Sequence, residues 1–115
     1  MADDDPAVRR LIRGILTDAG YRVTEAEDGR QAVRLLAEGH YDLLLLDIVM
    51  PEQEGLETIG FVRRRYRDLK IIAMSGFTEN YLKMAMMLGA GDAIAKPIRV
   101  ETLLAAVRRA LSGRV

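Results

Sequence analysis

Residues Leu43–Pro51 read LLLLDIVMP: four consecutive leucines, then an aspartate and a further apolar stretch that ends at a proline. Four leucines in a row show neither the spacing of an amphipathic helix nor the alternation of a half-buried strand. A short continuous apolar run is typical of a parallel strand that is buried on both faces. We therefore expect a central strand at Leu43–Leu46, with Asp47 at its carboxyl end.

Helix and strand patterns alternate on both sides of this run. Apolar residues recur at helical spacing near residues 8–16, 32–36, 56–62, 80–88 and 100–111. Further strands are expected at Tyr21–Glu25, Lys70–Met74 and Asp92–Ala95. Asp5, which precedes Pro6, and Asp28 are expected to cap helices. The alternation predicts an α/β fold: a parallel sheet with right-handed crossovers and helices on both faces.

The composition is that of one globular domain. The chain has 115 residues, half of them hydrophobic, and its 17 basic and 17 acidic residues cancel. This length supports a single core, so we treat residues 1–115 as one domain. Zero net charge gives no electrostatic reason to expect nucleic acid or an anionic membrane as a partner. With one histidine and no cysteine, the usual zinc sites and thiol chemistry are excluded.

Charged and polar residues mark the ends of the expected strands. Asp47, Ser75 and Lys96 each follow an apolar strand, and Asp3 and Asp4 lie near the start of the chain. In open parallel sheets, ligands bind beyond the carboxyl ends of the strands, so we expect these groups to meet at one edge. Clustered carboxylates suit Mg²⁺, whereas an ammonium and a hydroxyl suit phosphoryl oxygens. The combination indicates phosphoryl transfer onto an aspartate.

These residues lie in motifs that resemble the receiver domain of two-component response regulators, over nearly the whole chain. In order, the motifs are Asp3-Asp4, Leu43–Pro51, Met74-Ser75-Gly76, Gly89-Ala90-Gly91-Asp92 and Lys96-Pro97. The resemblance implies a flavodoxin-like (βα)5 fold, in which a doubly wound parallel sheet has the strand order 2-1-3-4-5. It also implies a phospho-accepting signalling switch, which is not an enzyme beyond self-phosphotransfer and autodephosphorylation.

The resemblance assigns the phosphoacceptor and the metal ligands. Asp47 would take a phosphoryl group from a phosphohistidine of a sensor histidine kinase or of a phosphotransfer protein, in a Mg²⁺-dependent reaction. Asp4 would bind Mg²⁺ directly, and Asp3 would lie nearby and act through water. Asp47 and the main-chain carbonyl of Val49 would complete the protein ligands. Asp5, by contrast, is interpreted as a helix cap and not as a ligand.

The resemblance also assigns the residues that respond to the phosphoryl group. Lys96 would pair with the aspartate and then with the phosphoryl group, and its peptide bond to Pro97 is expected to be cis. Ser75 would move inward to hydrogen-bond the phosphoryl oxygens. A downstream target or output domain would read the change on the fourth helix, last strand and fifth helix, a surface that could equally form a homodimer. We expect a cytoplasmic protein without direct contacts to nucleic acid or membrane.

Two other functions stay open at this point. A pseudo-receiver would bind partners without being phosphorylated; the acidic and lysine motifs argue against it, and the short first strand argues for it. An enzyme that uses Asp47 as a nucleophile, such as a phosphatase, would usually carry a general acid two residues later and a cap domain. Val49 and the short chain argue against that enzyme.

The clearest departure from the family pattern concerns the first strand. Only Met1 and Ala2 precede Asp3, where the family has a longer apolar strand. Since that strand is central in the sheet, its loss should open a gap between the strands around Val23 and Leu44. Either residues precede this sequence, or the chain compensates by dimerising or by adding a strand. Asp3 and Asp4 would lie on a frayed terminus, which bears on stability and metal affinity.

Three further positions differ from many receivers. Ala93 replaces an aromatic residue that swings with the switch serine or threonine, so no rotating ring can report the state of Ser75. Val49 and Phe77 are apolar where other receivers position the water that hydrolyses the phosphoryl group. We therefore expect a long phosphoryl lifetime. Rapid decay of labelled protein that is unchanged by Val49→Asn would contradict this expectation.

Overall fold

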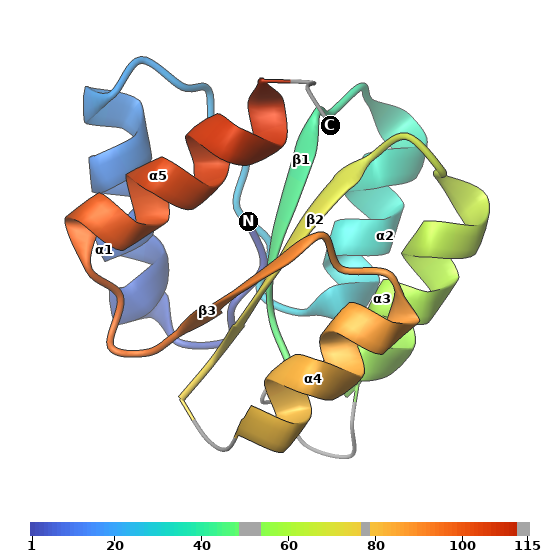
Figure 1. Cartoon of the computed structure of the whole chain (residues 1–115). Helices are drawn as coiled ribbons and strands as arrows, with labels where there is room; N and C mark the ends of the chain where they lie inside the picture. The colour runs from blue at the N-terminus through green and yellow to red at the C-terminus, as the bar shows by residue number, and fades with distance from the viewer. Residues whose placement is uncertain (49–53, 77–78, 113–115) are drawn as a thin grey trace.

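The computed structural model describes residues 1–48, 54–76 and 79–112. The elements follow in the order α1 (Pro6–Asp18), α2 (Gly29–Glu38), β1 (Leu43–Asp47), α3 (Glu54–Arg65), β2 (Lys70–Ser75), α4 (Glu79–Leu88), β3 (Asp92–Ala95) and α5 (Val100–Leu111) (Figure 1). Each helix lies where the apolar spacing predicted it, and the side chains of Asp5 and Asp28 cap α1 and α2 as expected. In the described part of the chain, no helix is both long and apolar enough to cross a bilayer.

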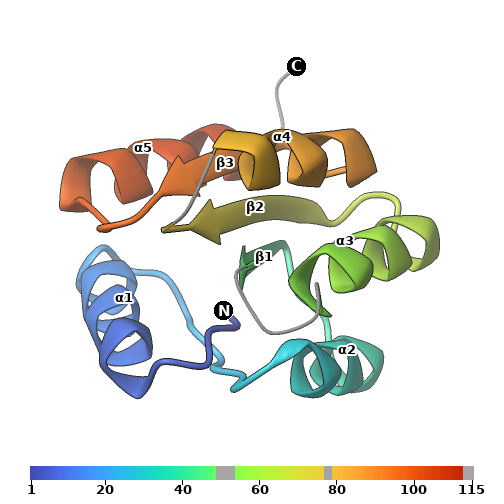
Figure 2. The same ribbon diagram turned by 90° about the horizontal axis from the view of Figure 1, so that it is seen from below.

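Within the described residues, the strands form one parallel sheet in the order β1-β2-β3. Asp47 lies opposite Met74 in the first pair of strands, and Ser75 lies opposite Ala95 in the second. Helices α1 and α5 cover one face of the sheet, and α2, α3 and α4 cover the other (Figures 1 and 2). Because the strands are parallel, their carboxyl ends share one edge of the sheet.

The leucine run of β1 packs against both layers of helices. Leu44 and Leu46 belong to a buried cluster that includes Ile59 of α3. Leu45 belongs to the cluster on the opposite face, with Ile12 of α1. The three leucines are at most 4% exposed. A strand covered on both faces needs an apolar residue at every position, which explains why the run is continuous.

The start of the chain replaces the expected first strand only in part. Ala2 forms isolated parallel bridges with Leu46 on one side and with Ala26 on the other. The amide of Ala2 donates to the carbonyl of Leu45 at 2.8 Å, and the amide of Ala26 donates to the carbonyl of Met1 at 2.8 Å. The spatial order is therefore that of a 2-1-3-4-5 sheet whose first two strands are reduced to a few residues.

The strand predicted at Tyr21–Glu25 is wrong, because these residues are not in a strand. A strand needs a hydrogen-bonding neighbour along its length, and only two residues lie ahead of Asp3 to serve as one. The gap expected near Val23 and Leu44 is present as an open groove of about 540 Å³, with Val23 and Leu45 in its lining.

Candidate functional site

The carboxyl ends of the strands carry the polar residues that the sequence singled out. Asp47 is the last residue of β1, Ser75 is the last residue of β2, and both are buried. Lys96 directly follows β3, and its amide donates to the carbonyl of Ser75 at 2.8 Å. The peptide bond between Lys96 and Pro97 is cis. The parallel sheet thus brings three distant chain segments to one edge.

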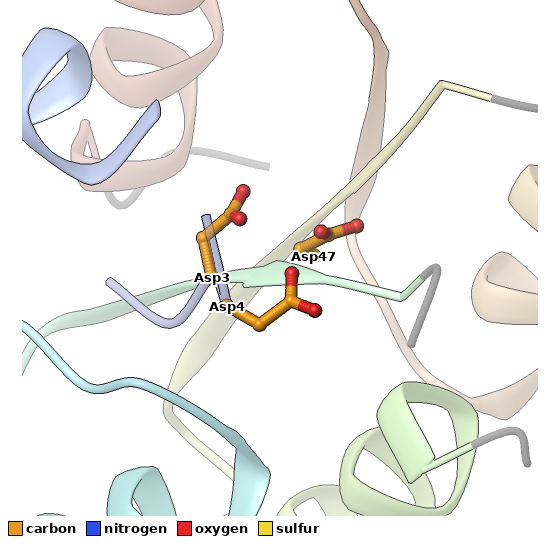
Figure 3. Close-up of side chains that lie close together, drawn as sticks. All are labelled: Asp3, Asp4 and Asp47. Carbon is orange, nitrogen blue, oxygen red and sulfur yellow. The ribbon is translucent and has the colours of Figure 1, made fainter. Parts of the chain in front are cut away.

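The amino-terminal acidic pair reaches the same edge. The backbone bonds between Ala2 and β1 place Asp3 and Asp4 beside Asp47 (Figure 3). One carboxylate oxygen from each of these three residues lies within 4.8 Å of the others. Asp3 is fully buried, whereas Asp4 is exposed. The structure therefore brings the adjacent pair Asp3 and Asp4 beside Asp47, which is distant from them in the sequence.

Lys96 supplies a positive charge inside this acidic cluster. Its Nζ donates to Oδ2 of Asp3 at 2.8 Å and to Oδ2 of Asp47 at 3.0 Å. Burial by itself lowers the pKa of Lys96, but the hydrogen bonds and charges of the two aspartates outweigh burial and raise it. The side chain is consequently held as an ammonium beside the expected phosphoacceptor.

The donor set fits a divalent cation. Three carboxylates and one ammonium have a formal net charge of −2, and carboxylate oxygens are the ligands that Mg²⁺ prefers. Both oxygens of Asp3 are already engaged, since Oδ1 accepts the amide of Asp5 at 2.9 Å and Oδ2 accepts Lys96. The carboxylate of Asp4 has no hydrogen-bond partner in the described part of the chain. Asp4 and Asp47 are therefore the better placed to hold Mg²⁺ directly, with Asp3 beside it.

Not every predicted site residue can be placed. Val49, expected to offer a main-chain carbonyl to the ion, lies outside the described residues, as does Phe77. Ala93 is half-buried in β3, where its backbone pairs with Ala73 of β2.

Arg9 and Glu25 anchor the acidic pair, a role that sequence reasoning did not identify. Nη1 of Arg9 donates to the carbonyl of Asp3 at 2.6 Å. Nε of Arg9 lies 3.4 Å from Oε1 of Glu25, whose other oxygen accepts Nη1 of Arg13 at 2.6 Å. Because Asp3 and Glu25 are distant in the sequence, no local pattern could reveal this network. It opposes the fraying that we expected at the amino terminus.

Gly55 is a second residue that sequence reasoning missed. A Cβ at this position would lie 2.4 Å from Cα of Ile48 and 2.9 Å from the carbonyl oxygen of Asp47. Only glycine therefore lets the start of α3 approach the end of β1 so closely. Glycine inside a helical pattern is unfavourable, and this was the available signal for a packing role.

A comparison with known families agrees with this geometry. The model of the response regulator receiver domain matches residues 1–108. The transcriptional regulatory protein DltR of Streptococcus agalactiae is 35% identical over 109 residues, which cover 94% of this chain and 49% of that protein. The response regulator MprA of Mycolicibacterium vanbaalenii is 38% identical over 112 residues, or 96% of this chain and 48% of that protein. The chain thus spans about half the length of these curated relatives.

Solved structures show the same architecture. The receiver domain of NtrX from Brucella abortus matches with a TM-score of 0.91 and 28% identity, covering 98% of this chain and 97% of that one. The response regulator TrrA from Thermotoga maritima, solved in complex with Mg²⁺ and BeF, matches with a TM-score of 0.87 and 32% identity. That match covers 96% of this chain and 95% of the other. The flavodoxin-like fold predicted from the sequence is confirmed.

Proposed function

This chain belongs to the response regulator receiver domain family, and from that premise we propose that Asp47 is its phosphoacceptor in a Mg²⁺-dependent reaction. One observation carries the proposal: the ammonium of Lys96 lies 3.0 Å from the carboxylate of Asp47, at the edge where Asp3 and Asp4 also gather. A buried carboxylate with a fixed cation and further acids beside it suits the acceptance of a charged phosphoryl group.

In the proposed reaction, an oxygen of Asp47 forms a bond to phosphorus while the bond from phosphorus to a donor phosphohistidine breaks. The imidazole nitrogen leaves with the bonding electron pair. Lys96, already bonded to Asp47, shifts its donors to the new phosphoryl oxygens. Mg²⁺ held by Asp4 and Asp47 would neutralise charge between the carboxylates and the phosphoryl oxygens. Ser75 supplies a hydroxyl at the same edge of the sheet.

We propose that the product acts as a switch. Phosphorylation adds a charge of about −1.5 to −2, and this charge favours the arrangement in which Ser75 and Lys96 both contact it. The Lys96 amide is bonded to Ser75 at 2.8 Å, so a displacement at one strand end affects the other. Because Ala93 carries no ring, we propose that the switch rests on Ser75, the nearby loop and α4.

The proposal includes partners on both sides of the reaction. A sensor histidine kinase or a phosphotransfer protein would donate the phosphoryl group. A downstream target or output domain would read the surface of α4, β3 and α5, which are in contact with one another through β3. The same surface could support a homodimer. We place these events in the cytoplasm, and we propose no catalytic turnover beyond self-phosphotransfer and autodephosphorylation.

Labelling by acetyl phosphate tests the phosphoacceptor. The unaltered chain should gain one phosphoryl group when Mg²⁺ is present, as measured by intact mass, and Asp47→Asn should gain none. Asp42→Asn is the matched control, because Asp42 is exposed at the opposite end of β1 and should be labelled normally. Equal labelling of the Asp47 and Asp42 variants would refute the assignment.

The shortened first strand favours a second candidate, a pseudo-receiver that binds partners without being phosphorylated. Beryllofluoride with Mg²⁺ discriminates the two functions. In a phosphorylatable receiver it should shift the amide resonances of Ser75 and Lys96, whereas a pseudo-receiver should show no change. Turnover of a chromogenic phosphate ester by the unaltered chain would instead support a phosphatase.

A further inference from the structure

A hollow lies at the end of the sheet opposite the phosphoacceptor, where β2 and β3 begin. It is bordered by the connection between α3 and β2 and by the last turn of α5 (Figure 1). Its volume is about 370 Å³, within the range of about 300–1,000 Å³ that is typical of small-molecule sites. Leu69, Ile71 and Ile72 belong to its lining and are at most 6% exposed. The floor of the hollow is therefore part of the buried sheet.

Positive charge predominates around this hollow. Its charged residues are four cations and two acids: Arg63, Arg67, Lys70, Arg109, Asp68 and Asp92. The lining thus has a formal net charge of +2, whereas the whole chain has none. A concave surface with one predominant sign of charge concentrates ions of the opposite sign.

Most of this positive charge has no acidic partner. Nη2 of Arg109 lies 2.7 Å from Oδ2 of Asp92, so these two charges offset each other. The side chains of Arg67 and Lys70 form no hydrogen bond or ion pair within the residues that the structure describes. Asp68 follows Arg67 directly but forms no ion pair in that part of the chain either. The cations of the connection are therefore free to bind a ligand.

Arg63 places a further positive charge in the lining, and this residue is half-buried. Its Nε donates to the carbonyl of Gly89 at 3.1 Å, and its Nη1 donates to the carbonyls of Arg67 at 2.6 Å and Tyr66 at 3.4 Å. Backbone carbonyls satisfy these donors without neutralising the guanidinium. Nη2 has no hydrogen-bond partner in the described part of the chain. A positive charge that is half-buried and lacks an acid favours an anion nearby.

The chemistry of these groups indicates which anion fits. Guanidinium and ammonium groups form strong, charge-assisted hydrogen bonds to phosphate oxygens. A phosphate monoester carries a charge of about −1.5 to −2, which matches the formal +2 of the lining. A neighbouring hollow of about 840 Å³ also includes Arg67 and Lys70, together with the rings of Tyr41 and Tyr66. It offers space for the uncharged part of a ligand whose phosphate lies at these two cations.

We propose that this hollow is a binding site for a small phosphorylated molecule, separate from the phosphoacceptor site. The phosphate oxygens accept hydrogen bonds from Arg67 and Lys70, and Arg63 offsets part of the phosphate charge. Such a ligand would lie between the connection after α3 and the last turn of α5, since both line the hollow.

A titration followed by amide resonances tests the site. The probes are pyrophosphate, adenosine monophosphate and adenosine, added at constant ionic strength in buffer that contains a chelator and no Mg²⁺. The two phosphorylated probes should shift the amides of Arg67, Lys70 and Gly91 with a dissociation constant of about 1 mM or lower, whereas adenosine should not. The amides of Asp47 and Lys96, at the opposite edge of the sheet, should not shift. Neither Mg²⁺ nor phosphoryl transfer enters this measurement, so its outcome is independent of the proposed function.

A matched pair of substitutions separates a specific site from general attraction to cations. Arg67→Gln should weaken pyrophosphate binding at least about fivefold, because it removes a charge-assisted hydrogen bond. Arg64→Gln makes the same change of charge at an exposed position of α3 outside the lining, and should bind like the unaltered chain. Equal weakening by the two substitutions would overturn the proposal. So would shifts that do not saturate, shifts confined to Asp47 and Lys96, or binding of adenosine as tight as that of its monophosphate.

Discussion

The ammonium of Lys96 donates to the carboxylate of Asp3 at 2.8 Å and so joins residues that are 93 positions apart. The side chain of Asp3 has no exposed surface, and that of Lys96 is 20% exposed. A buried carboxylate without a partner is strongly destabilising, so this bond is part of the fold as well as of the site. Lys96 therefore has two roles, as a structural counter-ion of Asp3 and as the expected partner of the phosphoryl group on Asp47.

Lys96→Met should lower the free energy of unfolding by about 2–4 kcal/mol, because it leaves the charge of Asp3 buried and unpaired. Saturating Mg²⁺ should restore more stability to this variant than to the unaltered chain, since the ion would offset the same negative charge. Urea unfolding with and without Mg²⁺ measures both effects. Lys70→Met, at an exposed position at the start of β2, is the control and should change stability little. If Mg²⁺ stabilised all three proteins equally, the ion would not be offsetting the charge of Asp3 that Lys96→Met leaves unpaired.

Asp4→Asn and Asp3→Asn should separate metal binding from folding. Asp4 is exposed and unbonded in the described residues, so its substitution should weaken Mg²⁺ binding at least about tenfold while the unfolding free energy does not fall. Asp3→Asn should lower that free energy by about 1–3 kcal/mol, because it weakens a buried charged hydrogen bond. Calorimetric titration with Mg²⁺ and urea unfolding provide the two values. A lower free energy of unfolding in the Asp4→Asn variant would show that Asp4 also has a structural role, which contradicts its assignment as a metal ligand only.

Gly55→Ala should lower the free energy of unfolding by about 2 kcal/mol or more. The added Cβ would meet the backbone of Ile48 at 2.4 Å, and backbone there cannot move without displacing Asp47. Gly14→Ala is the matched control, because Gly14 lies in α1 with nothing within 4 Å of the added atom. That control should gain roughly 0.5–1 kcal/mol from better helix propensity. Similar effects of the two substitutions on thermal unfolding would exclude close packing at Gly55.

Arg9→Met should loosen the amino terminus. It removes the bond from Nη1 to the carbonyl of Asp3 and the ion pair with Glu25, and it should reduce stability by about 1–2 kcal/mol. Hydrogen exchange of the Asp3 amide, which donates to Ala26, should accelerate in this variant. Arg10→Met, at an exposed position on the same helix, should leave that exchange rate unchanged. Equal exchange in the two variants would mean that Arg9 does not anchor the chain.

The pH dependence of stability should contain a contribution from Glu25. Its hydrogen bond from Arg13 lowers the pKa of Glu25; burial opposes this, and the charges of Arg13 and Arg9 add to it. Because the pKa of Glu25 is lower in the folded state, its ionised carboxylate stabilises the fold at any pH above the unfolded-state pKa, which is near 4.5. This contribution is lost as the pH falls through the folded-state pKa. The stability difference between the unaltered chain and Glu25→Gln should therefore be largest near pH 6 and shrink below pH 4.5. A difference that is constant between pH 6 and pH 3 would contradict this contribution.

Sequence patterns predicted most of the fold because they are local. The leucine run, the helical spacing and the caps at Asp5 and Asp28 depend on neighbouring residues, and the structure contains all of them. The strand predicted at Tyr21–Glu25 failed for a different reason. Its alternating pattern is compatible with a strand, but a strand forms only where a neighbour supplies hydrogen bonds, and here that neighbour is short.

By itself, the sequence determined that the chain is an α/β domain, that Asp47 and Ser75 end two successive strands, and that Lys96 directly follows the next. In a parallel sheet the carboxyl ends of the strands lie at the same edge, so the order of helices and strands along the chain was enough to infer that these residues lie close together. Only the tertiary structure decided that Lys96 pairs with Asp3 as well as Asp47, that Arg9 fixes the backbone of Asp3, and that Gly55 packs on Ile48. These contacts join residues distant in the chain, and their distances depend on how the helices pack and not on any periodicity along the sequence.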